Sequence, residues 1–129
     1  MTVPPPIARA SWREIFCWLG RRRRRYQVVE RSMLPTLQPG DTVLAAPLNL
    51  SHKVLNGARA GSVRVGDIVI ARHPTQANLL LIKRVKETFY DGGCYLISDN
   101  LAEPTAQDSR SFGVIAADQL VARITCLLT

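Results

Sequence analysis

The sequence predicts a mainly β fold in a single domain that follows a short helix. At 129 residues the chain can bury one modest core, and 47% hydrophobic with 21% charged residues is typical of a globular protein. Eight glycines and eight prolines indicate many turns, and therefore short strands and few long helices. We divide the chain into an N-terminal arm, residues 1–25, and a β-rich domain, residues 26–129.

The arm consists of a Pro-rich start, a short amphipathic helix and a run of arginines, residues 21–25. Ser11 can cap the helix and Gly20 can end it. The apolar residues follow the i, i+3, i+4, i+7 spacing of one helix face; they are Trp12, Ile15, Phe16 and Leu19.

Two interpretations of the arm stay open. Its longest apolar run, residues 15–19, is far shorter than the roughly 20 residues of a membrane span, and the arginines follow this run instead of preceding it as in a secretory signal. In one interpretation the helix packs on its own domain or on a partner, with solvated arginines beside it. In the other, residues 12–25 contact a membrane surface, with aromatic side chains in lipid and arginines on anionic head groups.

The charge distribution argues against a nucleic-acid-binding domain. Of the net charge of +7, residues 1–25 contribute seven arginines and one glutamate, whereas residues 26–129 hold ten basic and nine acidic groups. A nucleic-acid-binding domain would spread its basic residues over one face. We therefore expect no nucleic-acid partner.

The cysteines and histidines indicate neither a disulfide framework nor a metal site. Cys17, Cys94 and Cys126 are odd in number and far apart, which favours a reducing, cytoplasmic compartment. His52 and His73 lack a third ligand at a suitable spacing. We expect no metal and no cofactor.

Short apolar runs predict the strands of the β-rich domain. The predicted strands cover residues 26–29, 42–45, 68–71, 79–86, 94–97 and 120–128. The second and third of them each follow a Gly-Asp turn. Residues 47–64 show no periodicity and predict a surface loop.

Ser32 stands where the first predicted strand gives way to a rigid loop. Pro35 and Pro39 follow it and exclude both a helix and a central strand. A nucleophile needs such a position, because its oxygen must stay exposed while the backbone behind it is held still. Ser32 is therefore a candidate nucleophile.

Lys83 is the candidate base. Alternate residues of a strand share a face, so Lys83 lies with Leu79, Leu81 and Val85, while Arg84 points to the other side. A free lysine is almost wholly protonated at neutral pH, but an apolar environment lowers its pKa and turns the amine into a proton acceptor. His73, at the end of a predicted strand, is the rival base.

Four stretches resemble the boxes of the signal peptidase I family and occur in the family's order. They are SMLPTLQPGD from Ser32, GDIVIARHP from Gly66, IKRV from Ile82, and SDN from Ser98 with the later DSR and FG. The resemblance runs from about Val28 to Phe112. It implies the coiled β-sheet catalytic domain that signal peptidases share with self-cleaving repressors of the LexA type.

The resemblance also implies the chemistry of the site. Ser32 would be the nucleophile and Lys83 the base, and the backbone N–H of Ser32 would be one oxyanion donor. Met33 and Pro35 would be structural residues near the site. The resemblance also implies that Asp108 and Arg110 form a structural ion pair close to the site.

The sequence departs from the family in two places near the site. Glu30 stands where the family has a small residue, and we expect its carboxylate to turn away from the oxyanion, towards Arg31 or Arg110. Ala106 stands where some members have a serine that hydrogen-bonds the lysine amine, and Thr105 is the neighbouring hydroxyl. The second oxyanion donor stays unassigned.

Within the family, the short chain is most similar to the maturation proteases of nickel-type superoxide dismutase. That resemblance implies a precursor protein as substrate, the dismutase proenzyme, whose N-terminal propeptide is removed. The lack of a membrane-spanning segment suggests a substrate that does not emerge from a translocon. The alternatives are signal peptidase-like processing of exported proteins and a catalytically degenerate docking module.

Overall fold

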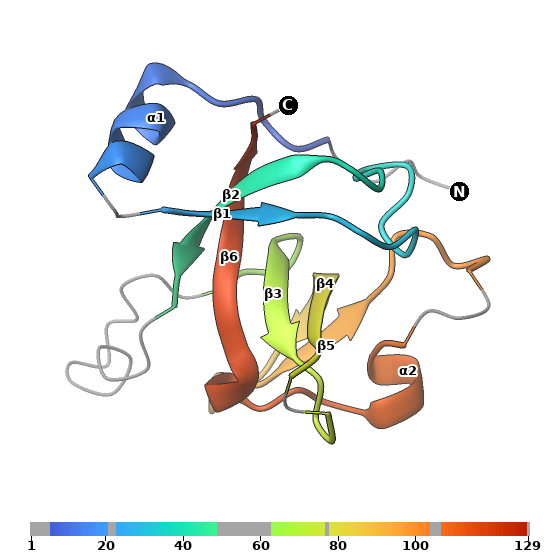
Figure 1. Cartoon of the computed structure of the whole chain (residues 1–129). Coiled ribbons are helices and arrows are strands. Elements are labelled where there is room, and N and C mark those ends of the chain that lie inside the picture. The colour runs from blue at the N-terminus through green and yellow to red at the C-terminus, as the bar shows by residue number, and fades with distance from the viewer. Residues whose placement is uncertain (1–5, 21–22, 49–62, 77, 104–106, 129) are drawn as a thin grey trace.

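A six-stranded antiparallel sheet forms the body of the molecule (Figure 1). The computed structural model describes residues 6–20, 23–48, 63–76, 78–103 and 107–128. The strands are β1 (Arg24–Gln27), β2 (Thr42–Pro47), β3 (Ile68–Arg72), β4 (Leu80–Thr88), β5 (Cys94–Ile97) and β6 (Leu120–Leu127). Their order across the sheet is β1-β2-β6-β3-β4-β5.

The sheet is strongly curled: in Figure 1, β1 and β2 run across β6, whereas β3 runs beside it. The pairing register shifts between Leu44 and Ala45, between Ile70 and Ala71, and between Val85 and Glu87. Such bulges increase the local twist of a sheet. The prediction of a mainly β, coiled-sheet domain preceded by a short helix is confirmed.

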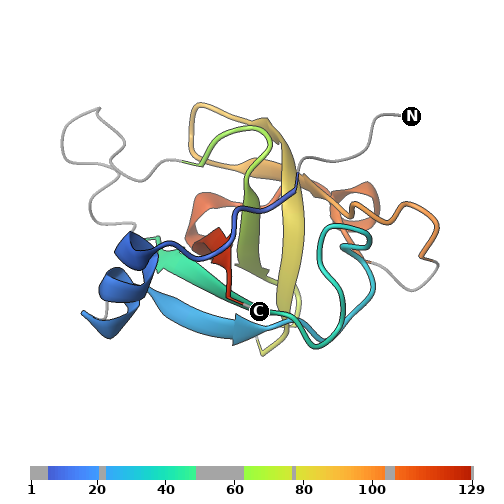
Figure 2. The ribbon, with the colours of Figure 1, turned by 90° about the horizontal axis from the view of Figure 1, so that it is seen from above.

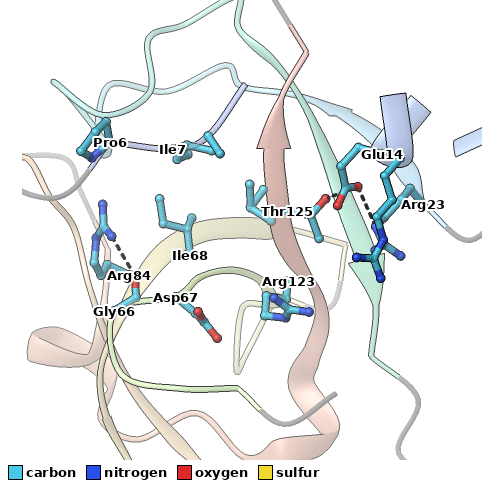
Figure 3. A pocket seen from close by; sticks show the side chains of 13 residues that line it. Pro6, Ile7, Glu14, Arg23, Gly66, Asp67, Ile68, Arg84, Arg123 and Thr125 are labelled. Atoms are coloured by element: carbon cyan, nitrogen blue, oxygen red, sulfur yellow. Dashed lines mark hydrogen bonds and ion pairs between the residues drawn. The ribbon is translucent and has the colours of Figure 1, made fainter. Parts of the chain in front are cut away.

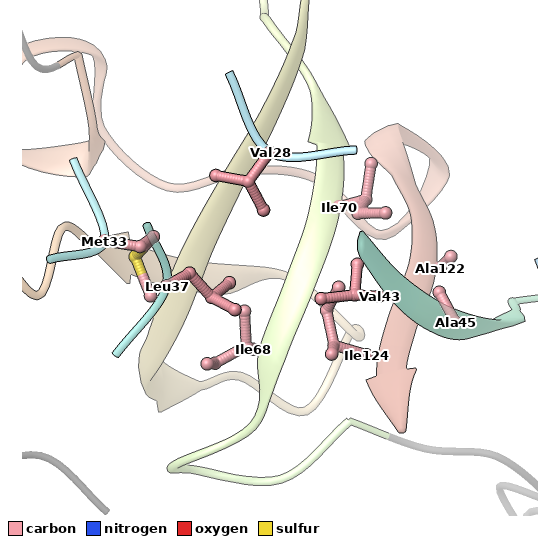
Figure 4. Close-up of a cluster of buried hydrophobic side chains, with 9 residues drawn as sticks. All are labelled: Val28, Met33, Leu37, Val43, Ala45, Ile68, Ile70, Ala122 and Ile124. Carbon is pink, nitrogen blue, oxygen red and sulfur yellow. The ribbon is translucent and has the colours of Figure 1, made fainter. Parts of the chain in front are cut away.

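Two clusters of buried apolar side chains stabilise the sheet. Figure 4 shows the first cluster, which the loop after β1 helps to fill; it consists of Val28, Met33, Leu37, Val43, Ala45, Ile68, Ile70, Ala122 and Ile124. The second consists of Val69, Ala71, Val85, Cys94, Leu96, Ile115 and Leu120. Alternation along β3 assigns Ile68 and Ile70 to one cluster and Val69 to the other.

Several strand boundaries differ from the prediction by about one or two residues, and β1 begins at Arg24, inside the predicted arm. β1 ends at Gln27 instead of residue 29, because Val28 turns into the core while its backbone still pairs with Asp41 and Gly40. β2 continues to Pro47, which the sequence assigned to a loop. Pro47 lies opposite Ala122 of β6, beyond the described pairing with β1, so its missing N–H costs no bond on that side. Residues 49–62 of the predicted loop lie outside the described residues.

The helix of the arm is present as α1 (Trp12–Leu19), with the Ser11 hydroxyl accepting a hydrogen bond from the Glu14 N–H. The sequence did not predict α2 (Ser109–Phe112) or the 3-10 turn η2 (Ala117–Gln119). Asp108 causes the first, because its carboxylate caps α2. Among the described residues, the helices are too short or too polar to cross a membrane.

Candidate active site

The loop after β1 carries Ser32 and is fixed at both ends. At its base, Val28 N–H donates to Asp41 O and Gly40 N–H donates to Val28 O. Met33, next to Ser32, is fully buried in the first core cluster. These contacts hold the backbone behind Ser32 still, but Ser32 as a whole is only 5% exposed, so it is more buried than the sequence predicts for a nucleophile.

Pro35 does not contribute a buried contact to this loop. It is exposed and follows a cis peptide bond with Leu34. The loop is instead anchored by Leu37, which is fully buried and donates its N–H to Met33 O. Of the two residues that the sequence placed as structural neighbours of Ser32, Met33 is therefore the one that packs in the core.

Lys83 is a fully buried lysine at the centre of β4. Its exposed fraction is 1%, and Leu81 and Val85 on the same face are buried as well. Across the sheet it lies opposite Val69 of β3. The apolar face that the sequence alternation predicted is thus the environment of the amine.

The only hydrogen bond of the Lys83 amine among the described residues goes to Ser98, whose Oγ accepts at 3.2 Å. Burial lowers the pKa of Lys83 below its ordinary value of 10.5. Glu30 and Asp108 oppose this effect and raise the pKa, whereas Arg110 lowers it further. The burial effect dominates, so the amine loses its proton more readily than that of a free lysine, which is the direction that a general base requires.

Asp108 and Arg110 form an ion pair next to Ser98. Arg110 donates from Nη2 to Asp108 Oδ2 at 2.9 Å, and the Ser98 N–H donates to the same oxygen at 2.9 Å. Burial alone would raise the pKa of Asp108, but the hydrogen bonds from Arg110 and Ser98 outweigh it and lower the pKa to about 2. Asp108 is therefore charged at neutral pH and holds the backbone of Ser98 in place.

Residues 98–100 connect Ser32 to Lys83. Asn100 donates its backbone N–H to Ser32 O at 2.8 Å and its side-chain amide to Arg31 O at 3.0 Å. Two residues earlier in the same segment, Ser98 binds the Lys83 amine. Two residues of chain span at most about 7 Å. Figures 1 and 2 show the cyan loop after β1 beside the orange segment after β5 in both views.

The described residues contain no hydrogen bond between Ser32 Oγ and Lys83 Nζ. The amine is turned to Ser98 instead, and the Ser32 N–H has no assigned acceptor in the described part of the chain. Catalytic hydrogen bonds are often long in free enzymes and tighten when the substrate binds. Residues 98–100 thus contact both Ser32 and the Lys83 amine, and the Ser32 N–H is left available as a donor.

A second ion pair fixes the Ser32 loop to β4. Arg84 donates from Nε and Nη2 to the two carboxylate oxygens of Asp99, at 3.0 and 2.8 Å. Thr36, in the Ser32 loop, donates its hydroxyl to Asp99 Oδ2 at 2.6 Å. Because Arg84 is adjacent to Lys83 in β4, this bidentate pair positions the loop relative to the lysine strand.

Glu30 does not form the ion pair that the sequence suggested. Among the described residues its carboxylate pairs with neither Arg31 nor Arg110, since Arg110 is already bound by Asp108. Glu30 is exposed and lines the same pockets as Ser32. Its negative charge reaches Lys83 and raises the pKa of the amine.

His73 is held in a structural role. It is buried, and Nδ1 accepts a hydrogen bond from the Thr75 N–H, so Nε2 carries the proton and donates to Gln107 Oε1 at 2.6 Å. The ring also packs edge-on against Phe112. With both nitrogens engaged, His73 is not available as the rival base. His52, Thr105 and Ala106 lie outside the described residues.

The described residues contain no group of histidine, cysteine and carboxylate side chains that could hold a metal ion. Next to Ser32 there is instead a small, mainly apolar groove of about 160 Å³. Residues 26–30 form one wall, and Ile70, Leu80 and Ile82 of the sheet form the other. A cavity of about this volume can hold a benzene ring, so the groove can accept an apolar side chain.

Sequence reasoning missed Ser98, although a signal for it exists. Along β5 the buried positions are Cys94 and Leu96, and Ser98 continues this alternation with an exposed fraction of 0%. A period-two reading would therefore have placed its hydroxyl on the buried face. The ion pair of Arg84 with Asp99 was not predicted for a different reason: it depends on the path of the segment that follows β5.

A curled antiparallel sheet carries Ser32 on a fixed loop and a buried Lys83, with a lowered pKa, on strand β4. The chain belongs to the signal peptidase family: that family, described as signal peptidase, peptidase S26, matches residues 22–88. Signal peptidase I from Buchnera aphidicola subsp. Acyrthosiphon pisum (strain APS) is 35% identical over 66 residues. The match covers 46% of this chain and 20% of that relative, so the chain spans a small part of the relative's length.

Proposed function

We propose that this chain is a serine endopeptidase in which Ser32 is the nucleophile and Lys83 the general base. The observation that carries the proposal is the burial of Lys83, at 1% exposure and with a lowered pKa, one short segment away from Ser32. A buried lysine without a carboxylate partner is costly to a fold. Members of the peptidase S26 family typically use a Ser-Lys dyad, which accounts for that cost.

The reaction would be acyl transfer in two steps. Neutral Lys83 takes the proton of the Ser32 hydroxyl, and Oγ attacks the carbonyl carbon of the scissile peptide bond. The lysine ammonium then gives this proton to the leaving nitrogen as the C–N bond breaks, which leaves an acyl-enzyme. A water molecule, deprotonated by Lys83, hydrolyses the ester and restores the Ser32 hydroxyl.

The tetrahedral oxyanion of each step needs hydrogen-bond donors. The backbone N–H of Ser32 is suited to this role, because it has no assigned acceptor among the described residues. One such donor contributes about 3 kcal/mol to stabilisation of the transition state. Proximity of the Glu30 carboxylate to Ser32 works against a second donor on that side.

The substrate would bind as an extended strand. Among the described residues, β4 pairs with β5 only from Arg84 onwards, so residues 80–82 have no strand partner on that side. Addition of a peptide strand at such an edge supplies backbone hydrogen bonds, and the groove beside Ser32 selects the side chains. Because this groove is mainly apolar and about 160 Å³ in volume, we expect an apolar side chain before the scissile bond.

The proposed substrate is the precursor of a nickel-type superoxide dismutase, from which the enzyme would remove the N-terminal propeptide. Support for this substrate comes from the resemblance of the motifs around Ser32, His73 and Lys83 to the maturation proteases of that dismutase. The nickel ion would belong to the substrate and take no part in the cleavage.

The test is incubation of the purified chain with this precursor. The wild type should release the propeptide, and Ser32→Ala and Lys83→Met should release none. Lys86→Met is the matched control, because Lys86 lies on the same strand but is exposed. Cleavage by either Ser32→Ala or Lys83→Met contradicts the dyad, and binding of the precursor without cleavage by the wild type would support the docking module.

A second candidate function is signal peptidase-like processing of exported proteins. Two observations favour it: the matched relative is named signal peptidase I, and α1 exposes a row of apolar side chains. The two substrates are distinguished by supplying an exported preprotein and the dismutase precursor in parallel assays. Cleavage of the preprotein alone would replace the first candidate with the second.

A further inference from the structure

We propose that α1 and the arginines that follow it form a lipid-binding foot, which attaches the protein to the surface of an anionic membrane. We call Trp12, Phe16 and Leu19 of α1 the exposed stripe. The foot consists of this stripe together with Arg24 and Arg25 of β1. The inference does not depend on the proposed substrate or on the dyad.

The exposed stripe faces away from the domain. Its three side chains, Trp12, Phe16 and Leu19, are 76%, 67% and 70% exposed. On a helix with 3.6 residues per turn they fall within an arc of about 60°. No residue of α1 is buried. The interpretation in which the apolar face packs on its own domain is therefore wrong for these three residues.

A polar contact determines this orientation. Glu14 lies about half a turn from the centre of the exposed stripe, and its carboxylate accepts from Arg23 Nε at 2.9 Å and from Thr125 Oγ1 at 3.0 Å. Figure 3 shows this network at the wall of the open pocket under the helix. The helix thus turns Glu14 to the sheet and the exposed stripe to the outside, whereas an ordinary surface helix covers its apolar stripe.

The charge around the stripe identifies the partner. The described residues 6–27 contain five arginines and one glutamate, and that glutamate is bound by Arg23. Arg24 and Arg25 are exposed, as are Arg9 and Arg13. Exposed aromatic and leucine side chains, with exposed arginines on the same helix and in the strand that follows it, match an interface of apolar chains under negative head groups. An acidic protein surface would need pockets for the aromatic rings, whereas lipid accepts them without one.

The position of the foot is compatible with access to the candidate active site. In Figures 1 and 2, α1 lies at the opposite side of the molecule from the cyan loop that carries Ser32. Attachment through α1 would leave the groove open. Substitutions in the exposed stripe should also leave the activity on a soluble peptide unchanged, which separates this proposal from the proposed function.

The first experiment is flotation of the full chain with phosphatidylcholine vesicles, with and without phosphatidylglycerol. We expect binding that needs phosphatidylglycerol and weakens as salt is added. Trp12→Ser with Phe16→Ser should abolish it. Tyr90→Ser with Val114→Ser is the matched control, since it removes two apolar side chains that are 92% and 51% exposed elsewhere.

The second experiment tests whether vesicle binding depends on the charge of the foot or on the net charge of the whole chain. Arg24→Gln with Arg25→Gln should weaken vesicle binding about 25-fold, at about 1 kcal/mol per arginine. Arg72→Gln with Lys86→Gln removes the same charge at other exposed positions and should weaken it much less. Equal loss in both pairs would contradict a localised foot.

The third experiment reports insertion directly. The chain has two tryptophans, so Trp18→Phe leaves Trp12 as the single fluorescent indole. Its emission should shift to the blue when phosphatidylglycerol vesicles are added. Absence of vesicle binding by the folded wild type overturns the proposal. Binding of a precursor protein that needs Trp12 and Phe16, without vesicle binding, would assign the stripe to a protein partner instead.

Discussion

The amine of Lys83, in β4, donates a 3.2 Å hydrogen bond to the hydroxyl of Ser98, the residue that directly follows β5. A bulge between Val85 and Glu87 produces this arrangement. On one side of the bulge Glu87 pairs with Tyr95. On the other side, which is nearer to Lys83, Arg84 pairs with Ile97. Without the inserted residue, Ser98 would face Arg84 and the lysine would have no hydroxyl beside it.

Ser98→Ala should lower kcat about 100-fold with little change in KM, because a misplaced base costs rate and leaves substrate binding intact. Steady-state kinetics on a peptide substrate measure both constants. Ser109→Ala is the matched control: Ser109 is also buried, but its hydroxyl accepts from the Leu96 N–H and does not contact Lys83. A similar loss of kcat in both variants would show that Ser98 acts only through the stability of the fold.

Glu30→Gln should move the pH dependence of kcat/KM to lower pH. The activity rises as Lys83 loses its proton, and the carboxylate of Glu30 raises the pKa of that amine. Removal of the charge therefore lowers the pKa and shifts the acidic limb of the profile downwards. Glu103→Gln is the control, since Glu103 lines the same pocket beside Ser32 but does not affect Lys83. An unchanged limb in Glu30→Gln would contradict the role of Lys83 as the base.

The strands and the burial of Lys83 could be predicted because they depend on local patterns. Period-two alternation in β4 assigned Leu81, Lys83 and Val85 to one face, and the structure buries all three. The turns before β2 and β3 were marked by Gly-Asp pairs, at which Gly40 and Gly66 adopt positive φ. These features need no knowledge of the rest of the fold.

The contacts of the site could not be predicted, because they depend on register and on loop paths. A single bulge decides whether Ser98 meets Lys83 or Arg84, and no residue in the sequence marks it. The outward turn of α1 depends on Glu14 reaching Thr125, which is 111 residues away in the chain. Periodicity gives the faces of an element but not which face is covered.

Asp108→Asn should destabilise the fold at neutral pH by about 1–2 kcal/mol, less than the full pKa shift would give because Arg110 is half-exposed. Asparagine can still cap α2, so the loss reports the charge. The pKa of Asp108 is lowered from 3.8 to about 2, so its contribution is complete above the first value and is lost as the pH falls through the second.

Urea unfolding of the wild type and of Asp108→Asn across this pH range measures the difference. The free energies of unfolding of the two proteins should converge as the pH falls from 3.8 to about 2, the two pKa values of Asp108 in the unfolded and folded states. Asp118→Asn removes an exposed carboxylate and should follow the wild type at each pH. A difference between wild type and Asp108→Asn that stays constant down to the lowest pH would show that the ion pair with Arg110 is not its source.

Lys83→Met should abolish cleavage while leaving the fold as stable as the wild type or more stable at neutral pH. Methionine fills a similar volume, and it removes the cost of burying an amine whose partner is a single hydroxyl. In the wild type the folded pKa of Lys83 lies below the unfolded value of 10.5, so between these values the unfolded chain binds more protons and stability rises with pH. That rise should be missing in Lys83→Met and present in the control Lys86→Met. Urea unfolding at several alkaline pH values measures it, and an equal slope in all three proteins would mean that the amine of Lys83 is protonated in the folded state and cannot act as the base.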